Sequence, residues 1–286
     1  MSDLWYVSLI HTPEFADRVD EIVLEMSNSL YQQFVGSYVA GEKVRFEEVQ
    51  KAWRKTVGLI GPQSPLVESL YGAVREANMQ RRGKHQMRIV CGDPAIDWDM
   101  VNDINTVNLY SSRRDEWYAH VVQEQVLAKH HRALLIVGGM HFLRNSGNPL
   151  AHPSIETKLR KRGARTYVIL SGTNTPNDCC EMDHRFDSWP APSVISARGW
   201  VGELPAQSLI EGGYPNSKPT LKDNADAFLY LEPRDSLTSV SMTRTQLQGT
   251  AYPKEIERRL KIEMIPQADE APLFPENEEQ PQFPRP

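Results

Sequence analysis

The sequence predicts an α/β fold with a mostly parallel central sheet, helices on both faces, an additional helical layer and short C-terminal strands. Two observations predict this class. Short apolar runs rich in β-branched residues alternate along the chain with segments of helical periodicity, which is the pattern of successive strand and helix units. These runs are also continuously apolar rather than alternating, as expected for strands of a parallel sheet that are covered on both faces.

The first part of the chain is expected to form one strand and then a layer of helices. Asn28 or Ser29 follows the strand and can cap the next helix. Leu30, Phe34 and Tyr38 recur four residues apart, so we expect them on the apolar face of that helix. The expected elements are the strand EIVLEM at 21–26, the helix from about residue 29, and the helices 46–56 and 64–81.

The middle of the chain is expected to contain two more strands on either side of a long helix. Gly92-Asp93-Pro94 ends the first of these strands abruptly. Tyr118, Val122 and Val126 recur four residues apart and indicate one face of the helix. Gly138-Gly139 lets the chain turn off the second strand. The expected elements are the strand 87–91, the helix 114–130 and the strand 133–138.

Beyond these strands the pattern continues and then weakens. Gly163 is expected to close a helix as its C-cap. The expected elements are the helix 154–163, the strand 166–172, strand-like pieces within 193–204 and 226–233, and the helix 253–262. We therefore interpret residues 1–262 as a single α/β domain. Residues 263–286 are rich in proline and acidic residues and cannot build a core, which predicts a disordered tail.

The composition argues against several kinds of partner. A net charge of -5 and scattered basic residues provide no field for a phosphate backbone, so nucleic acid is not expected. The three cysteines cannot form a disulfide framework and indicate a reducing compartment. No apolar run is long enough to span a bilayer, and the first twenty residues do not resemble a secretory signal. As given, the chain is expected to be cytoplasmic.

Charged and imidazole side chains are expected at one edge of the sheet. The carboxyl ends of parallel strands meet at that edge, where ligands bind. Glu25 follows the first strand, and Asp93 and Asp97 follow the strand at 87–91. Arg114 and Asp115 open the long helix, and His141 follows the strand at 133–138. Arginine at a helix start opposes the helix dipole, so Arg114 suggests an anionic ligand or a developing oxyanion. His141 is suited to the role of base, acid or metal ligand.

Each of these residues also has a structural interpretation. Glu25 could be a solvated or capping acid, and Asp115 suits the first turn of any helix. Asp93 before proline is a good turn former, because its side chain accepts hydrogen bonds from nearby backbone amides. His130-His131 ends a helix, where positive charge is favoured. The sequence contains no motif of a zincin, serine hydrolase, Walker loop or dinucleotide-binding protein.

Four short segments carry motifs in a consistent order. The first contains Glu25-Met26, Gln32 and Tyr38 followed by Gly41. The segments are LEMSNSLYQQFVGSYVAGE, REANMQ, RRDEWYAHVVQEQVL and LLIVGGMHFL. Together they resemble ChaN-like proteins, and the last two also resemble erythromycin-esterase-like proteins. The chain thus resembles the haem-binding-uptake/Tiki/erythromycin-esterase-like superfamily over about residues 9–170.

The resemblance implies an α/β domain with a pocket at the strand ends, and it gives site roles to Glu25, Arg114, Asp115 and His141. It implies a hydrolase of ester or amide bonds, in which Glu25 and His141 activate water or hold a metal and Arg114 stabilises the anion. Family members begin with a strand that ends in Gly-Glu-x-x-His, and this sequence lacks that motif. Two expectations follow: either a segment with this motif lies upstream, where it could also have carried an export signal, or the protein lacks one strand and one catalytic histidine.

Two alternatives to the hydrolase stay open. The first is a protein that binds haem or another anionic small molecule, with Arg114 on a carboxylate and His141 as an axial ligand. The second is a relative that keeps the fold without the chemistry. The cofactor is unknown, with a divalent metal favoured over haem and Glu25 and His141 as candidate ligands. The expected partner is a small-molecule substrate or ligand.

Overall fold

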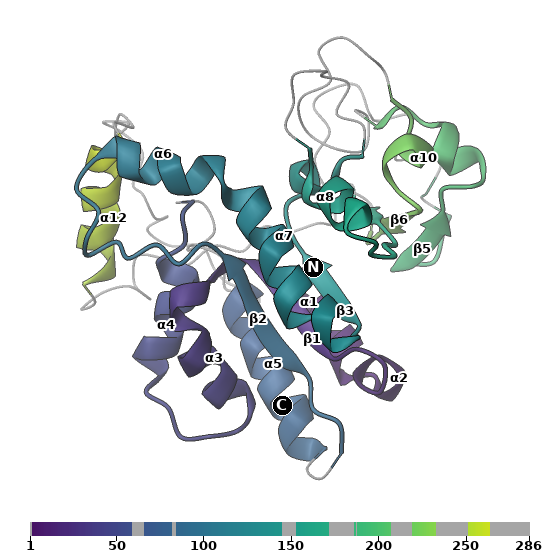
Figure 1. The fold of residues 1–286 in the computed structure, drawn as a ribbon. Helices are drawn as coiled ribbons and strands as arrows, with labels where there is room; N and C mark the ends of the chain where they lie inside the picture. The colour runs from purple at the N-terminus through teal and green to yellow at the C-terminus, as the bar shows by residue number, and fades with distance from the viewer. Residues whose placement is uncertain are drawn as a thin grey trace. The chain divides into compact units, whose positions relative to one another are not determined.

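A computed structural model of the chain describes residues 2–58, 66–81, 84–144, 153–171, 186, 188–206, 219–232 and 251–263. The described part is a mixed α/β protein that includes parallel strands, in agreement with the predicted class. Figure 1 shows the helices and strands in chain order. The chain divides into two compact units. Unit 1 is Met1–Glu21 with Asp115–Thr238, and unit 2 is Ile22–Arg114 with Ser239–Pro286. The single domain over 1–262 stays a prediction, and residues 264–286 of the predicted tail lie outside the described residues.

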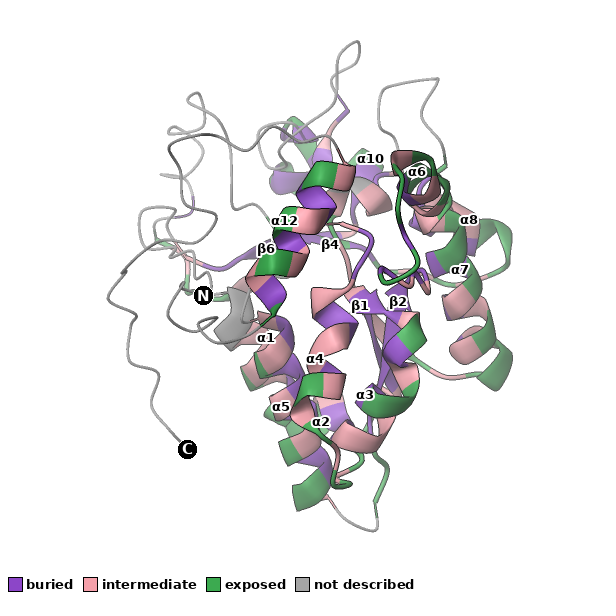
Figure 2. Ribbon diagram, turned by 90° about the vertical axis from the view of Figure 1, so that its left-hand side faces the viewer, coloured by how far each residue is buried: buried purple, intermediate pink, exposed green. Residues whose placement is uncertain are grey.

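Unit 2 is built around two neighbouring strands that are mostly buried. β1 (Glu21–Asn28), all of which except Glu21 belongs to unit 2, and β2 (Arg88–Asp93) are hydrogen-bonded neighbours in one sheet. They confirm the strands predicted from the apolar runs. The helices α3 (Gln32–Val39) and α5 (Leu66–Gln80) pack against each other and against β2, while α4 (Phe46–Arg54) packs on α3. Figure 2 shows the buried strands beside these helices. The predicted helical layer is therefore present in the described residues.

The helix after β1 buries a different face from the one predicted. Asn28 caps its first turn, because Oδ1 accepts a hydrogen bond from the Leu30 amide at 2.9 Å. Val35 and Val39 are buried, whereas Leu30 and Phe34 are 46% and 37% exposed. The predicted face of Leu30, Phe34 and Tyr38 was wrong, because the valines one position after Phe34 and Tyr38 are the buried residues of the helix. The capping turn is the 3-10 helix η1 (Ser29–Tyr31).

Two polar side chains connect helices to β2 and to the residue that precedes it. The Gln32 side chain donates to the carbonyl of Ile89 at 2.9 Å and accepts from the amide of Cys91 at 2.8 Å. Asn78 does the same at Met87, donating to its carbonyl at 2.8 Å and accepting from its amide at 2.9 Å. These side chains satisfy backbone groups that would otherwise be buried without partners. Their positions therefore have a structural reason in this chain.

The helical segment before β3 is divided differently from the prediction. Asp103 caps an unpredicted helix by accepting from the Thr106 amide at 3.0 Å. His130, with a left-handed φ of 57°, follows the last helical turn. Tyr118 and Val122 are buried, which confirms the predicted core face. In place of one predicted helix over 114–130, the structure has α7 (Arg114–Gln125) followed by η3 (Leu127–Lys129). The unpredicted helix α6 (Ile104–Ser112) precedes them.

Unit 1 contains a second sheet, with the strand order β4-β6-β5. β4 runs parallel to β6, with Leu170 opposite Phe228, and β5 runs antiparallel to β6, with Ile195 opposite the same Phe228. These three side chains share a core cluster with Phe186. The strands are β4 (Ile169–Ser171), β5 (Ser193–Ser196) and β6 (Ala227–Tyr230).

The strand β3 (Ala133–Ile136) is less buried than its apolar sequence predicts, since all four residues are partly exposed. Gly138 after it has φ -56° and ψ 137°, a conformation open to any residue, so the turn at that position does not require glycine. Gly163, by contrast, has φ +85° after its helix, as expected of a C-cap. No described helix is long and apolar enough to cross a membrane. The remaining elements are α1 (Ser2–His11), α2 (Pro13–Ala16), η4 (Gly139–Phe142), α8 (Ile155–Lys161), η5 (Trp200–Glu203), α10 (Leu221–Asn224) and α12 (Tyr252–Ile262).

Candidate functional site

Arg114 binds two carboxylates within unit 2. Its Nε donates to Oδ1 of Asp93 at 2.6 Å, and its Nη1 lies 3.0 Å from Oε1 of Glu25. The side chains of Arg114 and Glu25 are mostly buried, and that of Asp93 is completely buried. Charge-assisted hydrogen bonds in such surroundings are stronger than those at an open surface. The two carboxylates also explain why an arginine is tolerated at the start of α7, where it opposes the helix dipole.

Asp93 does not act as the local turn former that its position before proline suggested. Its Oδ2 accepts a hydrogen bond from the amide of Val57 at 2.6 Å, a residue 36 positions away. Burial raises the pKa of Asp93 to about 6, and this effect exceeds the opposite effects of the Arg114 guanidinium and the Val57 N–H. The prediction of a hydrogen bond to a neighbouring amide was wrong, because strand β2 ends inside unit 2 and directs the carboxylate into its interior.

Asp115 and His141 form a hydrogen-bonded pair within unit 1. Nδ1 of His141 lies 2.6 Å from Oδ1 of Asp115, and both side chains are partly exposed. An ionised carboxylate can only accept, so Nδ1 is the donor, and the lone pair of the neutral ring is on Nε2. A histidine held in this way is suited to accept a proton or to coordinate a metal through Nε2.

The segment that carries His141 is anchored on its C-terminal side by Arg144. The guanidinium of Arg144 binds both oxygens of Asp226, at 2.6 and 3.3 Å, and donates through Nε to Glu156 at 2.9 Å. Burial acts to raise the pKa of Asp226, but the hydrogen bonds from Arg144 and the Val168 amide outweigh it and lower that pKa. The turn η4 also packs against α8. Arg144 therefore fixes the backbone three residues after His141.

The four residues predicted from the sequence form two contacting pairs, one in each unit. Glu25 contacts Arg114 in unit 2, and Asp115 contacts His141 in unit 1. Among the described residues, neither of the two candidate metal ligands, Glu25 and His141, belongs to a group of three donors close enough to hold an ion. The roles of all four residues in one reaction stay a prediction.

Two interactions were missed in the sequence. Asp93 is expected at the same edge as Arg114, with a turn-forming role favoured, but the contact that makes it the closest partner of Arg114 was not predicted. His131 was interpreted as a helix end, yet its Nδ1 lies 2.7 Å from Oε1 of Glu21. A signal for the second pair was present, because Glu21 begins one predicted strand and His131 precedes another. The amino ends of parallel strands share an edge just as their carboxyl ends do.

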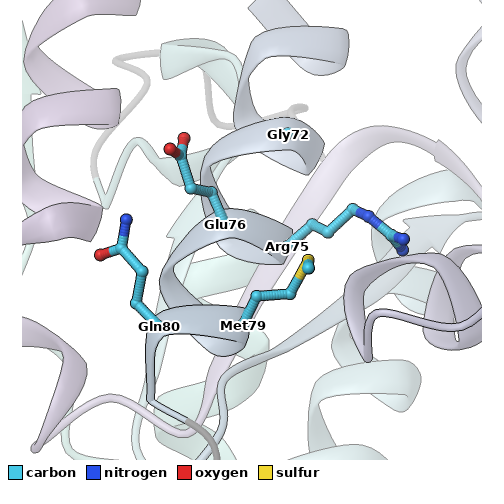
Figure 3. A pocket seen from close by; sticks show the side chains of 5 residues that line it. All are labelled: Gly72, Arg75, Glu76, Met79 and Gln80. Carbon is cyan, nitrogen blue, oxygen red and sulfur yellow. The ribbon is translucent and has the colours of Figure 1, made fainter. Parts of the chain in front are cut away.

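A hollow of about 450 Å³ lies on the surface of α5, a helix that carries none of the site residues predicted from the sequence. Figure 3 shows Glu76 and Gln80 on one side of the helix and Arg75 and Met79 on the other. The guanidinium of Arg75 already has a partner, since it donates to the carbonyl of Gly41 at 3.2 Å. Gly41 has a φ of +90°. None of the predicted site residues lines this hollow, so we assign it no role in catalysis.

Comparison with known proteins gives no match to a family model, a curated protein or a solved structure. The class of this protein is therefore described from its own fold and from the contacts of its candidate site residues. The described chain is a mixed α/β protein with an oriented histidine–aspartate pair in one unit. Its other unit has an arginine held between two carboxylates.

Proposed function

We propose that this protein is a hydrolase of ester or amide bonds, of the erythromycin-esterase/Tiki-like type, with His141 as the general base. The observation that supports this role is the hydrogen bond from Nδ1 of His141 to Asp115 at 2.6 Å. It fixes both the tautomer and the direction of the ring. The partial exposure of both side chains leaves the pair accessible from solvent. The substrate is proposed to be a small molecule.

In the proposed reaction, Nε2 of His141 takes a proton from water while the water oxygen attacks the carbonyl carbon. The carbonyl oxygen becomes an oxyanion in a tetrahedral intermediate. When this intermediate collapses, the bond to the alcohol or amine breaks, and the proton on Nε2 passes to that leaving group. Asp115 stabilises the imidazolium that exists between the two proton transfers. Each turnover therefore returns His141 to its neutral form.

Glu25 and Arg114 have roles that depend on the family resemblance, in which Glu25 activates water and Arg114 stabilises the anion. The contacts in unit 2 favour a more structural role for both. With Glu25 and Asp93 ionised, the charge of Arg114 is exceeded by that of its two partners. An external anion would have to replace one of them or bind when Asp93 is protonated. His141 and Asp115 are therefore the better supported catalytic residues.

The alternative function, binding of haem or another anionic small molecule, has weaker support for the same reason. Its anion-binding residue would be Arg114, whose guanidinium is held by Asp93 at 2.6 Å and by Glu25 at 3.0 Å. A titration with haem tests it directly. A shifted absorption band that is lost in the His141→Ala variant would favour haem binding over hydrolysis.

Hydrolysis is tested with a series of p-nitrophenyl esters and fluorogenic peptides, using wild-type protein and the variants His141→Ala and Asp115→Asn. We expect kcat/KM to fall by about 10²-fold or more in His141→Ala, the usual effect of losing a general base. His120→Ala is the matched control, because His120 is an exposed histidine on α7, the helix that carries Asp115. An inactive wild type, or equal rates in wild type and His141→Ala, would contradict the proposed function.

A further inference from the structure

Three side chains of the kinds that bind metals meet at the start of β1 in unit 1. The carboxylates of Asp20 and Glu21 and the imidazole of His131 place their donor atoms within 4.8 Å of one another. Nδ1 of His131 lies 2.7 Å from Oε1 of Glu21. None of the three residues takes part in the proposed hydrolysis. This cluster therefore needs an explanation of its own.

The backbone holds these donors in place. The amides of Asp20 and Glu21 both donate to the carbonyl of Arg132, at 2.8 and 3.3 Å. The amide of Arg132 in turn donates to Oδ2 of Asp20 at 2.7 Å. The two segments are thus joined at Arg132, next to His131, although His131 and Glu21 are 110 residues apart in the chain. A metal ion would therefore bind to donor atoms that the folded backbone already holds in position.

The charge of the cluster favours a divalent cation. The side chain of Glu21 is completely buried, while that of His131 is 37% exposed and gives the cluster an open side. Two carboxylates and a neutral imidazole carry two negative charges, and a buried carboxylate is costly unless a cation or strong donors compensate it. A divalent ion would neutralise both carboxylates in one position.

We propose that Asp20, Glu21 and His131 form a binding site for a divalent transition-metal ion, for which Zn²⁺ is the best match. One imidazole nitrogen with two carboxylate oxygens is a ligand set that zinc accepts in tetrahedral sites. Calcium and magnesium prefer oxygen ligands throughout. The metal takes the place of the proton between His131 Nδ1 and Glu21, and the neutral ring then carries its proton on Nε2. Water completes the coordination from the exposed side.

Binding at this position connects the first residues of β1 to the segment just before β3. Because the ion binds the folded arrangement and not the unfolded chain, it stabilises the fold in proportion to its concentration. The expected role is structural, as a link between distant segments of the chain. Such a role requires no change in the proposed hydrolytic residues, so the two can be tested independently.

The test uses the full chain without a histidine tag, with Cys179→Ser and Cys180→Ser to remove competing thiols. After treatment with a chelator, the protein is dialysed against Zn²⁺, and the bound metal is measured by mass spectrometry. We expect one bound equivalent, an increase in Tm of about 4 °C or more at saturating Zn²⁺, and a visible absorption band when Co²⁺ replaces Zn²⁺. His131→Asn and Asp20→Asn are expected to weaken binding at least 10-fold.

The matched control is His130→Asn, which removes the neighbouring imidazole and keeps a residue that tolerates the left-handed backbone at that position. It is expected to bind Zn²⁺ as the wild type does. The variant Asp20→Asn is expected to stay folded, because the side-chain oxygen of the asparagine can still accept the hydrogen bond from the Arg132 amide. A loss of Zn²⁺ binding in this variant can therefore be assigned to the lost carboxylate. No binding by the wild type, or binding by His131→Asn equal to that of the wild type, would overturn the proposed site.

Discussion

Asp93 is completely buried and holds Arg114 at 2.6 Å, and burial nevertheless raises its pKa to about 6. The carboxyl therefore keeps a proton between about pH 4 and 6 in the folded protein, while the unfolded chain, with an ordinary value of 3.8, has released it. Because the folded state binds more protons in this window, the contribution of Asp93 to stability decreases as the pH rises from 4 to 6 and is constant above it.

This linkage is tested by comparing the wild type with Asp93→Asn. We expect the free energy of unfolding of the wild type, relative to Asp93→Asn, to fall by roughly 2–3 kcal/mol between pH 4 and pH 7. Urea unfolding at each pH measures the difference. Asp103→Asn is the control, because hydrogen bonds from Thr106 lower the pKa of Asp103 and place its titration below the window. If the difference in unfolding free energy between the wild type and Asp93→Asn did not change with pH, the raised pKa of Asp93 would be contradicted.

The hydrogen bond between Asp115 and His141 determines which ring nitrogen carries the proton. Replacing Asp115 by alanine removes the acceptor at 2.6 Å, so we expect His141 to lose its preference for the Nδ1–H tautomer. Long-range ¹H–¹⁵N spectra of histidine-labelled protein report the tautomer directly. Glu116→Ala is the control on the next residue, since Glu116 contacts Lys158 at 2.8 Å instead. An unchanged tautomer in Asp115→Ala would show that the pair does not orient the ring.

Arg144 is expected to be important for the stability of unit 1. Its replacement by methionine keeps the length of the side chain but leaves the buried Glu156 without a cation at 2.9 Å. Removing one partner of a buried ion pair costs about 3–5 kcal/mol. Arg160→Met is the matched control, because Arg160 lies 3.6 Å from the same carboxylate but is 59% exposed. We expect that control to cost less than about 1 kcal/mol, and equal effects in urea unfolding would contradict this interpretation.

Cys91 is expected to be unreactive in the folded protein. It is buried in β2, and burial raises the pKa of its thiol to about 12. Its thiolate is therefore nearly absent at pH 8, and reagents can reach it only when unit 2 opens. In a Cys179→Ser, Cys180→Ser background, we expect iodoacetamide to alkylate the native protein at least about 100-fold more slowly than the urea-unfolded protein. Mass spectrometry measures both rates, and equal rates would show that the thiol is accessible.

Much of the fold could be predicted from local patterns. The short apolar runs rich in β-branched residues predicted β1 and β2, and the recurrence of apolar residues every four positions predicted the core face of Tyr118 and Val122. Asn28 could be recognised as a cap because capping requires only a side chain and the next few amides. The helix α6 was not predicted, since its apolar residues have weak helical periodicity, although its cap at Asp103 is a local signal of the same kind as Asn28.

The candidate site shows the same division. The sequence by itself determined which side chains follow the strands, and it placed Glu25, Arg114 and His141 at one predicted edge of the sheet. Only the tertiary structure decided their partners: Asp93 for Arg114, Asp115 for His141, and Glu21 for His131. Those pairings join residues 21 to 110 positions apart. Local sequence patterns report the neighbours of a residue within a few positions, whereas contacts at such separations depend on how the strands and helices pack.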